Sequence, residues 1–273
     1  MSLPTSPPSP SDITVVLVHG AFADASGFTG VITALQRRGM RVVAPPNPLR
    51  GLASDSAYIA SVLDQIAGPV LLVAHSYGGA VITNAATNAS NVLGLVYVAG
   101  FAPDEGEILG AVAPESKDSV LNSALVPRRY LTAWTQQSDS TEFGIDPAQF
   151  HATFAADLPA DVAAVMAATQ RPIAEAAFTD ACGPPAWKRL PSWAVVATGD
   201  LTIGTDLVRS MAQRAGARIT EVEASHVVMI SRPDVVLEVI DTALEAVASA
   251  ASELPTPRRS DEQKAQQAAG STP

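Results

Sequence analysis

The sequence predicts an α/β fold, in which a mostly parallel sheet is covered by helices on both faces. Two observations predict this fold class: short apolar runs alternate with segments of helical periodicity, and the short runs are apolar almost throughout. Continuously apolar strands are typical of a parallel sheet that is buried on both faces. Of the 273 residues, 47% are apolar and only 16% are charged, so the chain can bury a large core.

The alternation can be followed along the chain. Apolar, β-branched runs predict strands at residues 13–18, 41–44, 70–74, 92–99, 193–198 and 218–222. Apolar residues at helical spacing predict helices at residues 27–38, 54–66, 77–88, 206–215 and 233–249. Gly39 is placed to end the first of these helices, and Ser54 or Asp55 is available to cap the second.

The alternation is interrupted between the fourth and fifth strands. Residues 103–190 are rich in Ala, Pro and polar residues, and an apolar run at 162–169 has helical spacing. We therefore expect a helical cap insertion at 103–190. It is carried by an α/β core made of residues 12–102 and 191–250.

The two ends of the chain differ from this core in composition. The Pro/Ser-rich residues 1–11 and the polar residues 251–273 cannot bury enough apolar surface to fold, so both are expected to be disordered tails. The start lacks the basic and apolar regions of a secretory signal. No run approaches the roughly 18 apolar residues that span a bilayer. We therefore expect a cytoplasmic protein with no membrane partner.

Charge and cysteine content exclude several classes of partner. The net charge of −10 disfavours nucleic acid and anionic lipid surfaces. Cys182 is the single cysteine, so the chain can form neither an intrachain disulfide nor a cysteine-based metal site. The four histidines lack the spacing of metal ligands. We expect no metal, no cofactor, and a monomer or homodimer.

The segment AHSYGG at residues 74–79 is the strongest functional signal. It lies between an expected strand and an expected helix, so Ser76 occupies a tight strand–turn–helix connection of the G-x-S-x-G type. Ala74 replaces the first glycine of that pattern and is still small. The turn projects the serine hydroxyl from the carboxyl edge of the sheet, where the first N–H groups of the helix also point. Ser76 is therefore the expected nucleophile.

The loop LVHGAF at residues 17–22 follows the first strand and leaves the same edge of the sheet. Its backbone can lie beside the serine turn, and Gly20 permits a close approach. We expect the backbone N–H groups of Ala21 and Tyr77 to bind an oxyanion, with Phe22 as a second candidate for the first donor.

The expected base and acid come late in the chain. His226 follows the last strand, and Asp200 follows the strand before it, so both lie at the edge that carries Ser76. A histidine there can take the serine proton, and the acid orients the imidazole and stabilises its charged form. Asp104, after the fourth strand, is a reserve acid, and His151, in the insertion, is a weaker candidate base.

The remaining candidates suit other roles. His19 adjoins the loop after the first strand and is expected to hold it, and His75, beside the serine turn, is expected to be packed and not catalytic. Asp206 and Asp234 suit the first turns of helices, where a negative charge is favourable. Cys182 has no neighbouring base in the sequence and is expected to be a structural thiol.

Five segments together resemble a known superfamily: HGAFADASGF, NPLRGLASD, AHSYGGAVITNAA, LVYVAGFAPDEGE and GPPAWKRLPSWAVVATGD. They look like a bacterial branch of the α/β-hydrolase superfamily, related to plant methyl-ester hydrolases and hydroxynitrile lyases. The resemblance spans roughly residues 13–248. It implies a small helical cap, no cofactor, a triad of Ser76, Asp200 and His226, and an oxyanion hole formed by Ala21 and Tyr77.

Two positions depart from the hydroxynitrile lyases of this group. Those lyases place a lysine directly after the catalytic histidine, where this chain has Val227. They also use a threonine two residues before the strand-end His-Gly, where this chain has Leu17. Both departures favour hydrolysis over lyase chemistry.

The expected function is hydrolysis of a carboxylic ester of a small, mostly apolar substrate through an acyl-enzyme on Ser76. The side chains expected to line the substrate pocket are Phe22, Phe101, Trp134, Phe143 and Phe154. For the aromatic residues of the cap, packing within the cap is the alternative. Other functions stay open: cofactor-free lyase, haloperoxidase or oxygenase chemistry on the same fold, or ligand binding without catalysis.

Overall fold

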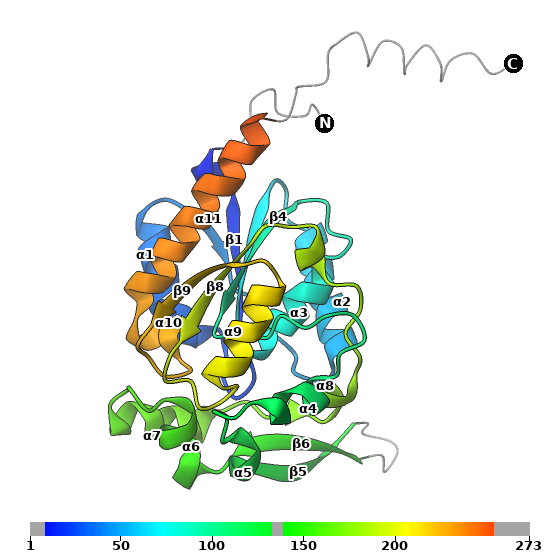
Figure 1. The fold of residues 1–273 in the computed structure, drawn as a ribbon, viewed down its shortest axis with the longest axis vertical. Helices are drawn as coiled ribbons and strands as arrows, with labels where there is room; N and C mark the ends of the chain where they lie inside the picture. The colour runs from blue at the N-terminus through cyan, green and yellow to red at the C-terminus, as the bar shows by residue number, and fades with distance from the viewer. Residues whose placement is uncertain (1–8, 133–138, 254–273) are drawn as a thin grey trace, which may run out of the picture.

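A computed structural model describes residues 9–132 and 139–253 of the chain (Figure 1). Its core is a six-stranded sheet in the order β2-β1-β3-β4-β8-β9, in which all neighbours are parallel. The strands are β1 (Thr14–Val18), β2 (Arg41–Val43), β3 (Val70–His75), β4 (Val92–Val98), β8 (Ser192–Ala197) and β9 (Arg218–Val222). The expected fold class is confirmed, and each expected core strand is present within one or two residues of its predicted bounds.

Helices cover both faces of this sheet (Figure 1). One face carries α1 (Thr29–Arg37) and α11 (Pro233–Glu253), which contact each other, and the other carries α2 (Leu52–Asp64), α3 (Tyr77–Ala85) and α9 (Thr205–Arg214). Short helices complete the core: η1 (Pro10–Asp12), η2 (Ala25–Phe28) and α10 (Val228–Ser231). Every residue of β1, β3 and β8 is buried, as expected for strands covered on both faces.

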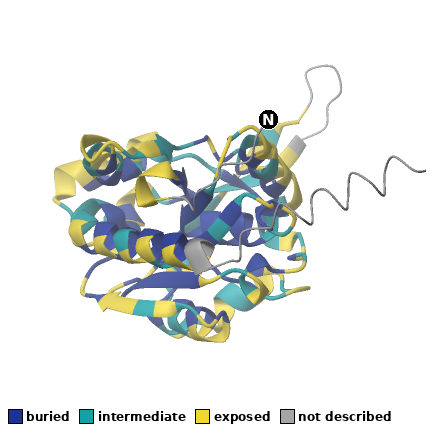
Figure 2. Ribbon diagram, turned by 90° about the horizontal axis from the view of Figure 1, so that it is seen from above, coloured by how far each residue is buried: buried dark blue, intermediate teal, exposed yellow. Residues whose placement is uncertain are grey.

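Burial divides each helix into an inner and an outer face. Figure 2 shows buried residues gathered in the sheet and on the helix faces that contact it, with exposed residues outside. The predicted start of α2 is wrong, because this helix begins at Leu52 after Gly51, not at Ser54 or Asp55. Asp55 is fully buried and accepts hydrogen bonds from the Arg50 amide and the Tyr77 hydroxyl. Asp55 therefore joins α2 to α3.

The insertion between β4 and β8 lies across the carboxyl edge of the sheet (Figure 1). Its helices are α4 (Leu109–Val112), η3 (Ala113–Glu115), α5 (Leu121–Ala124), α6 (Pro147–Phe154), α7 (Ala160–Thr169), α8 (Ala176–Thr179) and η4 (Ala186–Lys188). It also contains an antiparallel sheet of β5 (Leu125–Leu131), β6 (Asp139–Ile145) and β7 (Ile173–Ala174).

The insertion thus contains the expected helices and, in addition, an antiparallel sheet that the sequence did not predict. In β6, the apolar Phe143 and Ile145 alternate with Glu142 and Gly144, which is the period-two pattern of a strand. The pairing with β5 satisfies the backbone of both segments, so composition alone was a poor guide here.

The expected tails lie mostly outside the described residues. Within the described part, η1 adds a short helical turn at residues 10–12, and α11 extends to residue 253, beyond the predicted core boundary. None of the helices in residues 9–132 and 139–253 combines the length and apolar character needed to cross a lipid bilayer.

Helix α3 packs unusually close to its neighbours because it begins with glycines. A β-carbon on Gly78 would lie 2.6 Å from the carbonyl oxygen of Val18, and one on Gly79 would lie 2.4 Å from that of Phe101. Both obstacles are backbone atoms, which cannot rotate away. The close contact places the start of α3 against the ends of β1 and β4.

We predict that Gly79→Ala lowers the free energy of unfolding by about 1–3 kcal/mol, because the added methyl group must displace backbone. Gly30→Ala is the matched control in α1: its β-carbon would meet Pro233 at an ordinary 3.5 Å. This variant should be as stable as the wild type or more so. Urea denaturation measures the free energy of unfolding of both variants. Equal denaturation midpoints for Gly79→Ala and wild type would contradict the prediction.

Candidate active site

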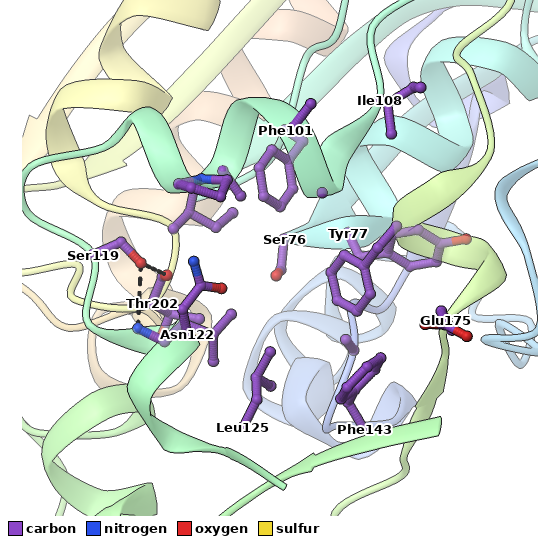
Figure 3. Close-up of a pocket in the computed structure, with 18 of the residues that line it drawn as sticks. Ser76, Tyr77, Phe101, Ile108, Ser119, Asn122, Leu125, Phe143, Glu175 and Thr202 are labelled. Atoms are coloured by element: carbon purple, nitrogen blue, oxygen red, sulfur yellow. Dashed lines mark hydrogen bonds between the residues drawn. The ribbon is translucent and has the colours of Figure 1, made fainter. Parts of the chain in front are cut away.

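Ser76 lies at the junction of β3 and α3 in a conformation that few non-glycine residues adopt. Its backbone has φ 56° and ψ −128°, outside the ordinary helical and extended regions. Its amide donates to Val98 at 3.2 Å, and its carbonyl accepts from the amides of Gly79 and Phe101 at 2.9 and 3.2 Å. These bonds hold the turn, which directs the Ser76 hydroxyl into a cavity (Figure 3).

The loop after β1 rests directly against this turn. A β-carbon on Gly20 would lie 2.5 Å from the β-carbon of Ser76, so only glycine fits. The loop is held by His19. Its Nε2 accepts a hydrogen bond from the backbone N–H of Asn47 at 2.9 Å, so its Nδ1 carries the proton and donates to the Gly20 carbonyl at 2.8 Å. Burial lowers the pKa of His19, so this imidazole stays neutral.

Two backbone amides beside Ser76 are free to bind an anion. The amides of Ala21 and Tyr77 have no acceptor among the described residues, and both residues line the cavity with Ser76. The Phe22 amide instead donates to the carbonyl of Arg171 at 3.0 Å. This bond removes Phe22 as an oxyanion donor and leaves Ala21 and Tyr77 as the available pair.

Asp200 and His226 form a buried pair at the same edge of the sheet. His226 Nδ1 lies 2.8 Å from Asp200 Oδ2, and the two side chains are 0% and 1% exposed. The other oxygen of Asp200 accepts from the amides of Thr202 and Ile203 at 2.8 and 3.1 Å. Because Nδ1 donates to the carboxylate, Nε2 carries the lone pair in the neutral ring. Nε2 has no hydrogen-bond partner within the described chain, so it is available as a base.

The His226 ring packs against two other rings, which also contact each other. The centroid of His75 lies 4.6 Å away and that of Phe154 lies 5.1 Å away. His75 Nε2 contacts the His226 carbonyl at 3.0 Å, and burial holds the pKa of His75 well below its usual value. Phe154, expected in the substrate pocket, does not line the cavity; it is completely buried against the rings of Phe22, Phe150 and His226.

The other candidate groups are engaged elsewhere. His151 Nε2 bonds to the carbonyl of Leu158 at 2.9 Å within the insertion. The reserve acid Asp104 pairs with Lys188 at 2.5 Å. Asp206 accepts hydrogen bonds from Ser116 and from the Lys117 amide, which ties α9 to the insertion. Burial raises the pKa of Cys182 to about 11, so this residue is a protonated thiol at neutral pH.

The cavity in front of Ser76 has a volume of about 450 Å³ and mostly apolar walls. Of the expected pocket residues, Phe22, Phe101 and Phe143 line it, while Trp134 lies outside the described residues. The polar side chains at its wall, besides Ser76 and Tyr77, are Ser119, Asn122, Glu175, Thr179 and Thr202. Figure 3 shows the Asn122 amide pointing from α5 toward Ser76. Sequence reasoning did not single out these residues, because no motif marks them.

The insertion is also tied to the loop that carries the base. Asp157, between α6 and α7, accepts from the Ser225 amide at 2.9 Å and from the Ser225 hydroxyl. Ser225 directly precedes His226. Burial acts to raise the pKa of Asp157, but hydrogen bonds, of which that from the Ser225 hydroxyl is the strongest, together outweigh it and hold the pKa below its ordinary value of 3.8.

We predict that Asp157→Ala lowers the thermal unfolding midpoint at pH 7, and that its difference from wild type narrows as the pH falls below 3.8. A carboxylate with a depressed folded-state pKa stabilises the fold above its unfolded pKa and loses that effect as the pH falls through its folded pKa. Asp161→Ala, in the first turn of α7, is the control. Scanning calorimetry from pH 7 to 3 tests this, and a constant difference would refute it.

Comparison with known proteins agrees with this architecture. A sequence model of the alpha/beta hydrolase family matches residues 15–239. A carbendazim hydrolyzing esterase from Nocardioides sp. is 32% identical in an alignment of 114 positions, which covers 37% of this chain and 47% of that esterase. The match thus spans less than half the length of that relative.

Solved structures share the fold at low sequence identity. Tomato methylketone synthase I superposes with a TM-score of 0.71 at 17% identity, covering 86% of this chain and 99% of that one. A pyrethroid hydrolase from Sphingobium faniae superposes with a TM-score of 0.66 at 19% identity, covering 87% and 99% of the two chains. Since the family model matches most of the sequence, the chain belongs to the alpha/beta hydrolase family.

Proposed function

We propose that this protein hydrolyses carboxylic esters of small, mostly apolar substrates through an acyl-enzyme on Ser76. The observation that carries the proposal is the free Nε2 of His226. Asp200 fixes this ring, which packs against His75, the residue directly before the serine turn with its two free amides. This set of groups is the one that acyl transfer requires. The esterase and hydrolase names among the similar proteins support the same reaction class.

The proposed reaction has two halves. His226 Nε2 removes the proton of Ser76 as its oxygen attacks the ester carbonyl, and the amides of Ala21 and Tyr77 bind the oxyanion. Each such donor is typically worth about 3 kcal/mol in the transition state. His226 then gives the proton to the departing alcohol, and a water molecule repeats the sequence on the acyl-enzyme.

Asp200 and His75 both affect how readily His226 becomes positively charged during this cycle. The Asp200 carboxylate stabilises the imidazolium that forms when Ser76 loses its proton. His75, kept neutral by burial, places no positive charge beside that imidazolium. His226 can therefore gain a proton without repulsion from the neighbouring His75 ring, which is tilted by 51° to it.

Two buried positions favour hydrolysis over lyase chemistry. Val227, directly after the base, and Leu17, before the His-Gly of the β1 loop, are both 0% exposed. Neither side chain can donate or accept a hydrogen bond. The groups that the resemblance assigns to cyanide handling therefore have no counterpart here.

We predict that Ser76→Ala lowers kcat for p-nitrophenyl acetate by at least about 1000-fold, because no other group can form the acyl-enzyme. Ser61→Ala, on the outer face of α2, is the matched control and should keep full activity. A fluorophosphonate should label wild type at Ser76 and leave Ser76→Ala unlabelled, as intact-mass spectrometry would record. Full activity in Ser76→Ala would overturn the nucleophile assignment.

We also predict that Asp200→Asn lowers kcat by roughly 1000- to 10,000-fold, because an amide cannot hold the required tautomer of His226 or stabilise its charge. Asp104→Asn, which replaces the surface partner of Lys188, should change kcat by less than about twofold. Steady-state kinetics on the two variants distinguishes the acids. A larger loss of kcat in Asp104→Asn than in Asp200→Asn would reverse the roles assigned to the two acids.

A further inference from the structure

The walls of the cavity differ in chemistry on the two sides of Ser76. Figure 3 shows the neutral polar residues Ser119, Asn122 and Thr202 on one side of the nucleophile, and Phe143 and Glu175 on the other. An ester has two arms that extend in opposite directions from its carbonyl carbon. The two sides of the cavity can therefore select the two arms by different chemistry.

The second side carries a pair of aromatic rings. Phe143 on β6 and Phe178 on α8 meet edge to face, with centroids 6.0 Å apart and planes at 74°. Both rings line the cavity and are only partly buried. Aromatic faces are negatively polarised and attract cations within about 6 Å of the ring centroid.

Glu175 adds a full negative charge to the same side. It precedes α8 and lies three residues before Phe178, so it reaches the cavity from the same segment. Within the described lining it is the only residue with a formal charge at neutral pH, since burial raises the pKa of Tyr77 well above its usual value.

No structural partner accounts for this carboxylate in the described chain. Glu175 occupies the N-cap position of α8, yet its side chain makes no capping hydrogen bond. Glu142, close by on β6, is paired with Arg50 at 2.7 Å, whereas Glu175 has no ion pair within the described residues. Glu175 is exposed and lines the same cavity as the two partly buried rings. A carboxylate and aromatic rings that line one cavity are the combination that binds organic cations.

We propose that Phe143, Phe178 and Glu175 form a subsite for an organic cation, a protonated amine or quaternary ammonium group, on one arm of the ester. The proposal rests on the esterase function proposed above and names its substrate class. The rest of the cavity is apolar, so the remainder of the substrate is hydrophobic.

The test compares esters that differ in charge and match in shape. In the first pair, choline butyrate carries a quaternary ammonium group on the alcohol arm, and 3,3-dimethylbutyl butyrate carries a neutral tert-butyl group there. In the second pair, the ethyl ester of trimethylglycine carries the ammonium group on the acyl arm, and the ethyl ester of 3,3-dimethylbutanoic acid carries the neutral group. We define the preference as the ratio of kcat/KM for the cationic ester to kcat/KM for its neutral partner. In wild type this ratio should exceed one in at least one pair. Glu175→Gln should reduce that preference about tenfold, through a lower kcat/KM for the cationic ester.

Further variants separate the subsite from a general charge effect. Glu175→Lys should invert the preference, and Phe178→Leu, which keeps an apolar side chain, should reduce it about threefold. Glu245→Gln, on the outer surface of α11, changes the net charge equally and should leave the preference at the wild-type value. Equal ratios in wild type and Glu175→Gln would overturn the proposal.

A binding measurement keeps the subsite testable if no ester is cleaved. Failure of every neutral ester, with Ser76 unlabelled by a fluorophosphonate, would overturn the proposed function but not the subsite. Calorimetry with benzyltrimethylammonium should then give a Kd about tenfold higher for Glu175→Gln than for wild type. Equal Kd values, or no binding to either protein, would overturn the subsite.

Discussion

The left-handed backbone of Ser76 is the constraint on which the rest of the site depends. A bulky or polar residue with φ 56° is strained by about 1–3 kcal/mol and persists only where its surroundings hold it. Here β4 and α3 hold it, through hydrogen bonds to the amide and carbonyl of Ser76. The sharp reversal at this point directs the hydroxyl into the cavity (Figure 3), and the Tyr77 amide has no acceptor among the described residues. One backbone distortion thus accounts for both the proposed nucleophile and a proposed oxyanion donor.

The same constraint explains why this part of the site could be predicted from the sequence. The turn forces α3 against the backbone of Val18 and Phe101, so only glycine fits at positions 78 and 79. A steric requirement of this kind leaves a local motif. Asp200 and His226 could be located by a second simple rule, because the loops that follow parallel strands all meet at one edge of the sheet.

The insertion could not be predicted in the same way. Its antiparallel sheet joins segments by long-range pairing, and the tie between Asp157 and Ser225 connects residues 68 positions apart. No local pattern encodes such contacts. Phe154 illustrates the limit: an aromatic residue in a cap can face the ligand or the catalytic base, and only the packing around His226 decides between them.

The two parts of the molecule therefore have separable roles. The bonds that orient Asp200, His226 and the Ser76 turn lie within the α/β core, and the insertion reaches the base loop through Asp157. The far walls of the cavity come instead from α5, β6 and α8 of the insertion. Changes in these segments can alter which ligands fit the cavity while the core keeps its geometry. Selectivity in this fold can thus vary without rebuilding the chemistry, as long as the contact at Asp157 is kept.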